Sequence, residues 1–547
     1  MPPMMMRDSR SLRRLWDTVR WLRPSQVYGR LWFRAYRPRP DLRPAPPLRL
    51  RAGPWVDPAA RAASMTGPDS FILLNQARDI TSAPAWDSAA VPKLWRYHLH
   101  YFDDLNAAGA PARAGWHQAL IERWLAENPP GRGTGWEPYP VSLRVVNWIK
   151  WARAGGALSS EARESLAVQA RWLTKRLEWH LLGNHLVANA KALVFAGSFF
   201  AGREADGWLE AGLEILRVQL PEQVLADGGQ FERSPMYHAL AAEDLLDLLN
   251  AARAWPGRVD ARLLSDFGER AQRMLHWLGG MCHPDGEIAL FNDSAFGVAP
   301  THAELFAYAA RLELKVLPPT QPIEHFAASG YVRVEQGAFF ALLDVGDIGP
   351  DYLPGHAHAD SLSFELSFEG KRWIVDSGCS TYAVGAERLR QRGSAAHNTV
   401  VVDGQDSSEV WSSFRVAKRA KARGVSIITQ EGKLVVSAAH DGYGRSAIVK
   451  RRWTVGKSSL RIEDRLEGDY ERATGYLHLH PDVQAVARDA HTVSLTLAGR
   501  ELTLRAEGAS LGLAASTWHP GFNLSLPNTV VVATFQRPAA SLHLELA

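Results

Sequence analysis

Three histidines and two aspartates lie close together in one short, strand-rich part of the sequence. Residues 355–360 read GHAHAD, and Asp376 and His397 follow further along the chain. On an extended segment the side chains of His356 and His358 point to the same face. Imidazole and carboxylate groups are typical ligands of zinc and similar divalent ions. The pattern predicts a metal site with one histidine left to face a substrate, and the alternative is a set of loop histidines and turn aspartates without a ligand.

A second group of polar residues lies much earlier, between apolar segments. Asn184 and His185 are adjacent, Asn189 follows, and Tyr237 lies in the polar segment 228–238. Polar groups this dense among apolar helices need partners, which a polar cleft supplies. The alternative is structural: the asparagines would cap or cross-link helices, and the tyrosine would pack with its hydroxyl group at the surface.

The elements that must position this second group are helices. Between about Thr81 and Leu314, apolar residues recur at intervals of three to four, with clusters of Pro and Gly between the segments. The predicted helices cover residues 95–105, 116–127, 141–154, 161–182 and 239–254. Successive helices joined by short loops predict an α/α array.

After Pro318, Pro319 and Pro322 the apolar period changes to two. Strands are predicted at residues 331–334, 361–368, 372–376, 399–402, 433–438, 447–455, 459–464 and 529–535. This pattern is typical of an all-β sandwich. We therefore divide the chain into a basic, Pro- and Trp-rich segment at 1–80 that packs on the helices, a helical domain at 81–318 and a sandwich at 319–547 that carries the metal site.

The composition is that of a globular protein with several cores. The chain has 547 residues, of which 46% are hydrophobic and 22% charged, which excludes a disordered or fibrous protein. Its 20 tryptophans suit carbohydrate grooves, although they also fill cores. The net charge of +4 is a weak indication of a polyanionic partner, and much of the excess lies between Arg7 and Arg51. No nucleic-acid-binding motif follows this basic segment, so we expect no nucleic acid partner.

The cysteines and apolar runs bear on the compartment. Cys282 and Cys379 are too few for a disulfide framework. Arginines interrupt residues 1–32, which leaves no apolar core for a secretory signal, and the apolar run at 192–201 is much shorter than a membrane span. We expect a soluble protein without a transmembrane segment, cytoplasmic by the absence of a signal peptide, with periplasmic or exported locations left open. The oligomeric state is unknown.

Taken together, the two groups of residues resemble the heparinase II/III-like superfamily, whose members act on uronate polysaccharides, and the resemblance covers most of the chain. The family pattern has an Asn-His pair on one helix, then a tyrosine, a His-x-His pair, an aspartate on the following strand and a histidine in an Ala-His-Asn-Thr-Val segment. The matching positions here are Asn184, His185, Tyr237, His356, His358, Asp376 and His397.

The resemblance implies a multidomain α+β fold, with an N-terminal (α/α) toroid followed by a C-terminal antiparallel β-sandwich. It implies that His358, Asp376 and His397 hold a divalent metal ion, usually zinc, with a mainly structural role. His356 would then face the substrate. Tyr382 is the candidate for a further active-site tyrosine that the sandwich supplies in some members.

The same residues suggest how a uronate polymer would be cut by β-elimination. A base removes the proton on the ring carbon beside the carboxylate, and the neighbouring glycosidic oxygen leaves once it is protonated. Asn184 and His185 are suited to bind the carboxylate and stabilise the enolate-like state. Tyr237 and His356 would share the proton transfers. A base role for the tyrosine requires its pKa to be lowered by nearby positive charge, from protonated histidine or from the guanidinium groups of Arg233, Arg388 and Arg392.

We expect the substrate to be an acidic polysaccharide or oligosaccharide. Residues 22–31 and 136–140 resemble the branch found in bacterial polysaccharide-synthesis loci, which indicates a bacterial protein. The residues assigned to substrate binding are Trp136, Glu137, Tyr139, Glu232, Arg233, Arg388 and Arg392. Alternative functions are a C5 uronate epimerase, a non-catalytic polysaccharide-binding protein of exopolysaccharide biosynthesis, and a glycoside hydrolase using carboxylates such as Glu137, Glu232 and Asp293.

Overall fold

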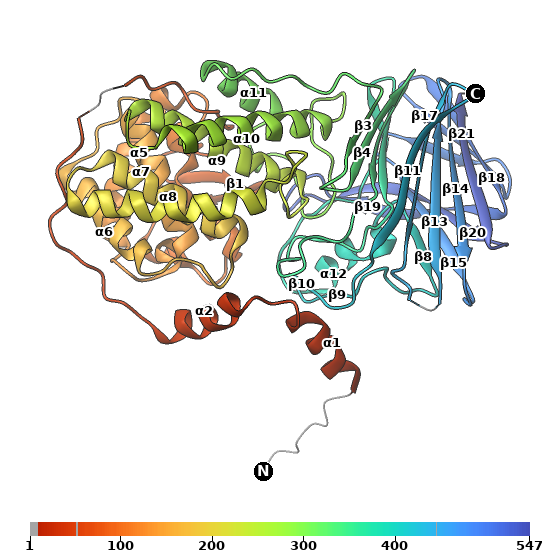
Figure 1. Ribbon diagram of the computed structural model, residues 1–547, viewed down its shortest axis with the longest axis horizontal. Helices are drawn as coiled ribbons and strands as arrows, with labels where there is room; N and C mark the ends of the chain where they lie inside the picture. The colour runs from red at the N-terminus through yellow and green to blue at the C-terminus, as the bar shows by residue number, and fades with distance from the viewer. Residues whose placement is uncertain (1–8, 51–52, 445, 547) are drawn as a thin grey trace, which may run out of the picture.

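The first part of the chain folds into helices and the second part into strands (Figure 1). The computed structural model describes residues 9–50, 53–444 and 446–546. The helices are α1 (Ser9–Val19), α2 (Pro24–Ala35), α3 (Lys93–Tyr101), α4 (Ala114–Glu127), α5 (Pro138–Arg153), α6 (Ser160–Thr174), α7 (Gly183–Phe199), α8 (Arg203–Gln223), α9 (Pro235–Ala254), α10 (Ala261–Gly280), α11 (His302–Arg311) and, among the strands, α12 (Ala386–Arg392).

Several helices begin at a side chain that accepts a hydrogen bond from a backbone N–H of the first turn. Ser159 caps α6, Ser234 caps α9, Asp260 caps α10 and Thr301 caps α11. Such a cap satisfies a backbone donor that has no partner within the helix. The starting points of these helices are therefore encoded locally.

One predicted helix is shorter than expected, and the next was not predicted. The helix expected over residues 161–182 ends at Thr174, because the chain turns where the backbone N–H of Glu178 donates to the side chain of Asn189 over 2.9 Å. The following helix, α7, is buried along almost its whole length and contacts α5, α8 and α9. A helix without a polar face carries no amphipathic signal in its sequence.

The strands begin with the hairpin β1 (Ser70–Leu73) and β2 (Gln76–Asp79), which lies before the helical domain. The remaining strands are β3 (Ile323–Phe326), β4 (Tyr331–Gln336), β5 (Phe339–Asp344), β6 (Phe364–Phe368), β7 (Lys371–Ile374), β8 (Val400–Val402), β9 (Val410–Trp411), β10 (Arg415–Val416), β11 (Ala422–Gln430), β12 (Lys433–His440), β13 (Ile448–Val455), β14 (Ser459–Glu467), β15 (Ala473–His478), β16 (Gln484–Ala487), β17 (Thr492–Leu497), β18 (Arg500–Glu507), β19 (Ala509–Trp518), β20 (Leu526–Phe535) and β21 (Ala539–Leu546).

The larger sheets stack on a shared core. Over the described residues their strand orders are β3-β4-β5-β6-β7, β11-β12-β13-β14-β21-β18-β17-β16 and β19-β20-β15-β8, with antiparallel pairing throughout. Strand β13 shows the alternation that builds this core, because Val449, Trp453 and Val455 are buried while Lys450 is exposed. Helix α11 ends at Arg311 and β3 begins at Ile323, so helices give way to strands in one short interval. The predicted order of a helical domain and an antiparallel β-sandwich is confirmed.

The N-terminal helices run along the lower edge of both domains in the view of Figure 1. Helix α2 is attached to the helical domain, where the guanidinium group of Arg176 donates to the carbonyl groups of Phe33 and Tyr36 over 2.8 and 2.7 Å. Helix α1 is attached to the sandwich, where Trp411 donates to Thr18 over 3.0 Å. The basic N-terminal segment therefore contacts both domains. Among the described helices, none is long and apolar enough to cross a membrane.

Candidate active site

Helix α7 brings Asn184 and His185 to the junction between the two domains. Before them the backbone passes through the left-handed region at Leu182 (φ 63°) and Gly183 (φ 55°). A Cβ atom on Gly183 would lie 2.4 Å from the side chain of Leu353 and 2.9 Å from Glu232, so both the conformation and the space require glycine. The backbone N–H of Asn184 donates to Glu232 Oε1 over 3.3 Å. This tight turn places both polar side chains at the start of the helix.

His185 is arranged to carry positive charge. Its Nδ1 lies 3.2 Å from Glu178 Oε1, and its ring centroid lies 4.5 Å from that of Tyr139. Burial alone would lower the pKa of His185, but the neighbouring Glu178 carboxylate outweighs it and the pKa is raised. The side chain keeps 29% of its surface exposed, so an imidazolium here can reach a bound anion.

Tyr237 lies in the first turn of α9, which Ser234 caps, and its ring faces the sandwich. It stacks on the His356 ring at a centroid distance of 3.8 Å, and its hydroxyl lies 3.1 Å from that of Tyr382. Burial raises the pKa of Tyr237 well above its usual range, and the hydrogen bond to Tyr382 opposes this only in part. The expected lowering of this pKa by positive charge is therefore wrong for the free protein. The phenol is held neutral.

The guanidinium groups that were expected to lower this pKa are used elsewhere. Arg388 is completely buried and forms a two-point ion pair with Asp293, with 2.7 Å between Nη2 and Oδ2. Arg392 is also completely buried and donates to the backbone carbonyl groups of Ala357 and Ser413. Arg233 donates to the backbone carbonyl of Asp347. Arg388 and Arg392 were predicted to contact the substrate, but neither side chain has exposed surface. Both instead support the site from inside the protein.

A single carboxylate holds both histidines of the GHAHAD segment. His356 Nδ1 donates to Asp293 Oδ2 over 3.0 Å, and His358 Nε2 donates to Asp293 Oδ1 over 2.9 Å. The Arg388 guanidinium and these two donors keep the pKa of Asp293 well below its usual range despite burial. Because Nδ1 of His356 is held by this carboxylate, Nε2 is the ring nitrogen available for proton transfer, and it lies 3.5 Å from Glu232 Oε2. Residues 355–360 form a loop instead of an extended strand, yet both imidazole rings still reach one partner.

The contacts link the predicted catalytic residues into one site. Glu232 joins the two halves, since Oε1 accepts from Asn184 and Oε2 lies 3.5 Å from Nε2 of His356. The structure thus brings together the side chains expected to act in catalysis, which are Asn184, His185, Tyr237, His356 and Tyr382. All of them keep part of their surface exposed, so a bound molecule can contact each of them.

The residues predicted to bind substrate at the start of α5 and just before it fall into two groups. Tyr139 lies against His185, and Glu137 accepts a hydrogen bond from Tyr97 and pairs with Lys93 at 2.8 Å. Trp136 packs in the core of the helical domain instead, where its indole N–H donates to the carbonyl of Asn128 over 3.2 Å.

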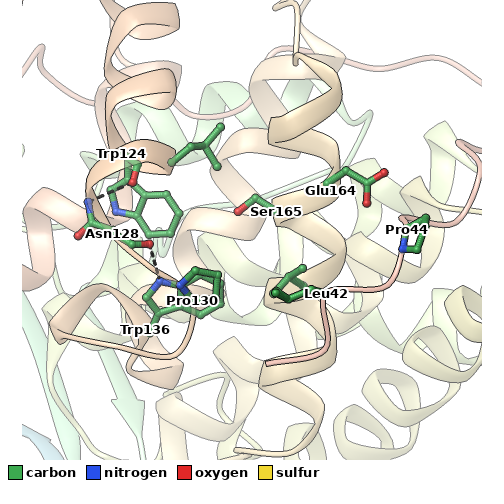
Figure 2. A pocket seen from close by; sticks show the side chains of 10 residues that line it. Leu42, Pro44, Trp124, Asn128, Pro130, Trp136, Glu164 and Ser165 are labelled. Carbon is green, nitrogen blue, oxygen red and sulfur yellow. Dashed lines mark hydrogen bonds between the residues drawn. The ribbon is translucent and has the colours of Figure 1, made fainter. Parts of the chain in front are cut away.

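Trp136 also lines a separate cavity of about 370 Å³. Figure 2 shows Trp124, Asn128, Pro130 and Trp136 on one side of this cavity, with Leu42 and Pro44 of the N-terminal segment and Glu164 and Ser165 of α6 on the other. The cavity contains none of the residues of the site at the domain junction.

Comparison with known families identifies this architecture. The family model described as Heparinase II/III N-terminus matches residues 160–313, and the model described as Heparinase II/III-like, C-terminal matches residues 318–542. The chain belongs to the heparinase II/III-like family.

Characterised relatives of this heparinase II/III-like chain include heparin-sulfate lyases. That of Pedobacter heparinus is 25% identical over 392 residues, which cover 65% of this chain and 56% of the relative. That of Bacteroides stercoris is 27% identical over 257 residues, which cover 42% and 37% of the two chains. The matched regions therefore span between 37% and 56% of the length of these relatives.

Solved structures confirm the fold. A crystal structure of heparinase III superposes with a TM-score of 0.69 at 18% identity, covering 84% of this chain and 79% of that one. The heparan sulfate lyase from Pedobacter heparinus superposes with a TM-score of 0.58 at 19% identity, covering 86% and 80%. The heparinase II/III-like fold of a toroid followed by a β-sandwich is thus shared.

The predicted metal ligands of this heparinase II/III-like chain lie close together and form hydrogen bonds, His397 with Asp376 and His358 with Asp293. The rings of His358 and His397 are 5.3 Å apart, and His397 Nδ1 donates to Asp376 Oδ2 over 2.7 Å. Burial would lower the pKa of His397, but the Asp376 carboxylate raises it to about 9. In the described part of the chain, no group of three or more His, Cys, Asp or Glu side chains is arranged to hold an ion.

The ring nitrogens that have no hydrogen-bond partner among the described residues are nonetheless suitable metal ligands. Nδ1 of His358 and Nε2 of His397 are buried and have no hydrogen-bond partner within the described residues. Buried polar atoms are normally paired, so two orphaned imidazole nitrogens beside a carboxylate fit a divalent ion in their chemistry. The metal site therefore stays a prediction.

Two carboxylates of the site have roles that the sequence did not indicate. The Glu178 carboxylate stabilises the protonated form of His185. Asp293 orients His356 and His358, whereas the sequence suggested it only as a carboxylate of a glycoside hydrolase. Both carboxylates lie in irregular segments, where no periodic pattern marks them, and Asp293 is also 63 and 65 residues away from its two histidine partners. Their burial and pairing become visible only in three dimensions.

Proposed function

We propose that this chain is a polysaccharide lyase that cleaves a uronic-acid-containing polysaccharide by β-elimination. The observation that carries the proposal is the stacked pair of Tyr237 and His356, in which a neutral phenol lies beside an imidazole that Asp293 holds at Nδ1, leaving Nε2 for proton transfer. Such a pair supplies one proton donor and one proton acceptor at the same point. The heparin-sulfate lyases among the relatives support this chemistry.

In the proposed reaction, His356 Nε2 accepts the proton from the ring carbon beside the carboxylate. The electron pair of that C–H bond forms the new carbon–carbon double bond, the bond to the glycosidic oxygen breaks, and Tyr237 donates its proton to the leaving oxygen. The protonated His185 and the amide of Asn184 bind the substrate carboxylate and stabilise the negative charge that develops on it. Asp293 is a positioning residue, because it acts only through His356.

A glycoside hydrolase is less well supported by the same geometry. An inverting or retaining hydrolase needs a carboxylic acid whose pKa is raised enough to stay protonated. Asp293 has the opposite property, since Arg388 and two histidines keep its pKa well below the usual range. A C5 uronate epimerase would use the same proton transfers without loss of the leaving group.

The product distinguishes these reactions. Heparan sulfate, alginate and other uronate polymers are the substrates to be tried. We expect the protein to digest at least one of them and to produce the ultraviolet absorbance of the conjugated double bond. New reducing ends without this absorbance would indicate hydrolysis, and intact chains with altered uronate configuration would indicate epimerisation. If none of these changes occurred while the protein still bound the polymer, it would be a binding protein.

We also propose that His358, Asp376 and His397 hold one divalent metal ion, probed first as zinc. The ion would supply a fixed positive charge that ties adjacent loops of the sandwich together. Ligation at His397 requires a ring nitrogen without a proton, so metal binding should release a proton and weaken at low pH. Elemental analysis of protein purified without chelator should find about one ion per chain, and His358→Ala should lower both the metal content and the melting temperature. Metal-free wild-type protein would exclude the site.

The biological setting is proposed more generally. We propose a bacterial protein of exopolysaccharide metabolism that is located in the cytoplasm and has no nucleic acid partner. The sequence features agree with this setting. Fractionation of source cells followed by immunoblotting would place it in a compartment.

A further inference from the structure

The two N-terminal helices carry apolar faces that the rest of the chain does not cover. On α1, Leu12, Leu15, Trp16 and Val19 follow one another at helical spacing and are all exposed, with Trp16 exposed to 64%. Large apolar side chains grouped in this way on a protein surface mark a site of interaction.

Helix α2 repeats this arrangement on its outer side. Val27, Tyr28, Leu31 and Trp32 form its exposed face, and Tyr28 is exposed to 72%. The inner side of α2 is fixed to the protein, because Gln26 is buried and donates to the backbone carbonyl of Tyr352 over 3.1 Å. The outward direction of the apolar face is therefore set by contacts on the opposite side.

Positive charge surrounds both faces. Residues 9–40 contain nine arginines and one acidic residue, Asp17, whereas the whole chain has a net charge of only +4. The remainder of the chain is thus net negative. Arg13 and Arg34 are among the arginines exposed beside the apolar side chains. Helices with leucine, valine and tryptophan on one face and arginine around it are typical of segments that lie in a membrane interface.

We propose that α1 and α2 dock this protein on the surface of an anionic lipid bilayer. The tryptophans and the tyrosine would sit at headgroup level, the aliphatic side chains would enter the acyl boundary, and the arginines would pair with lipid phosphates. The candidate active site lies near this surface, because α2 contacts the residues just before α7: the ring centroids of Phe33 and His180 are 4.2 Å apart.

Two other occupants fit the surface less well. An acidic polysaccharide would use the arginines and aromatic rings but not the exposed leucines and valines. A second copy of the chain, related by twofold symmetry, would bring the same arginine-rich surface against itself. An anionic bilayer complements both the charge and the aliphatic side chains.

The experiment is flotation of the full-length protein with vesicles of phosphatidylcholine alone or mixed with phosphatidylglycerol. We expect wild-type protein to float with the mixed vesicles, with weaker binding at high salt and to phosphatidylcholine alone. The variant Leu12→Ser/Trp16→Ser/Leu31→Ser/Trp32→Ser should bind at least about tenfold more weakly. The control Leu317→Ser/Val486→Ser removes exposed apolar side chains elsewhere and should bind like the wild type.

A second variant tests the proposal even if the first variant fails to fold. Arg13→Gln/Arg34→Gln keeps every apolar side chain and should lose most of the preference for phosphatidylglycerol. Absence of wild-type binding to mixed vesicles would overturn the proposal, as would equal binding by all variants. A wild-type dimer in sedimentation velocity that the serine variant dissociates, without vesicle binding, would assign the surface to a second copy. Retention on a heparin column without vesicle binding would assign it to polyanions.

Discussion

At the scale of single residues, Tyr237 has the properties of a proton donor. Its phenol is neutral, lies beside the His356 ring and shares a hydrogen bond with Tyr382. Replacing it with phenylalanine keeps the ring stacking and removes only the transferable proton. We expect Tyr237→Phe to lower kcat by about a hundred- to ten-thousand-fold while the melting temperature stays close to that of the wild type.

The matched control is Tyr382→Phe, which removes the hydrogen-bond partner but not the proposed donor. We expect a smaller loss of kcat there, measured on the same uronate polymer by the appearance of ultraviolet absorbance. Near-normal turnover by Tyr237→Phe would remove this tyrosine from the proton transfers.

The charge on His185 gives a prediction about pH. The Glu178 carboxylate raises the pKa of His185, so the imidazolium persists to a higher pH than in an ordinary histidine and is lost as the pH rises through this raised pKa. The affinity for an anionic substrate should therefore fall on the alkaline side. Glu178→Gln removes the charge that raises the pKa, and we expect the alkaline limit of kcat/KM to move to lower pH.

A profile of KM against pH checks this, with Glu204→Gln as the control. Glu204 pairs with Arg171 at 2.8 Å and has no contact with His185. If the alkaline limit were the same in Glu178→Gln and wild type, His185 would not be the group that binds the carboxylate.

Some of these residues could be predicted from the sequence and others could not, for physical reasons. Asn184, Tyr237 and His356 stand in short segments dense in polar residues, where composition and spacing already suggest chemistry. The neutrality of Tyr237 was not predictable, because it depends on burial and on the arginines having partners of their own. Arg388 lies over the ring of Tyr382, the hydrogen-bond partner of Tyr237, but its charge is neutralised by Asp293.

At the scale of elements, the start of α7 controls the geometry of the site. Gly183 adopts a left-handed conformation, and an added methyl group there would press on Glu232, which contacts both Asn184 and His356. We expect Gly183→Ala to destabilise the protein by about 1–2 kcal/mol and to lower kcat/KM further than that loss of stability explains. Thermal unfolding and steady-state kinetics measure the two effects.

Gly257→Ala serves as the control, because Gly257 also has a positive φ of 76° but open space around its Cβ position. It should lower the melting temperature through backbone strain alone, and therefore less than Gly183→Ala, without changing kinetics. Equal kinetics for the two alanine variants would mean that Glu232 does not depend on the turn.

Helices and strands could be predicted from the sequence where one face of the element is buried and the other is exposed to solvent. Amphipathic helices such as α4 and alternating strands such as β13 carry their own periodic signal. Helix α7 lacks that signal because it is surrounded by other helices, and the GHAHAD loop lacks it because its shape depends on Asp293 from another segment. The fold class followed from the sequence, whereas the register of buried elements did not.

At the scale of the whole molecule, Asp293 connects the two domains. It lies in the segment after α10, its backbone N–H donates to the carbonyl of His356 over 3.0 Å, and its carboxylate neutralises Arg388 of the sandwich. Asp293→Asn leaves the Arg388 charge buried without a counterion. We expect a loss of about 3–5 kcal/mol, seen as a lower urea midpoint, together with a fall in activity.

The control is Asp206→Asn, which breaks exposed pairs with Arg49 and Arg258 on the surface. Exposed pairs contribute about 0–1 kcal/mol, so its urea midpoint should hardly move. Similar midpoints for the two variants would show that Asp293 has no structural part in joining the domains.

The attachment of α1 to the sandwich has a consequence for the timing of synthesis. Thr18 and Trp411 are separated by 393 residues, so the ribosome must add most of the chain after α1 emerges before this contact can form. At roughly 5–20 residues per second, this takes about 20–80 s. Helix α1 is thus made long before its partner on the sandwich, whereas α2 can be fastened as soon as Arg176 has been made. The proposed contact of α1 with a bilayer therefore does not have to wait for the sandwich to fold.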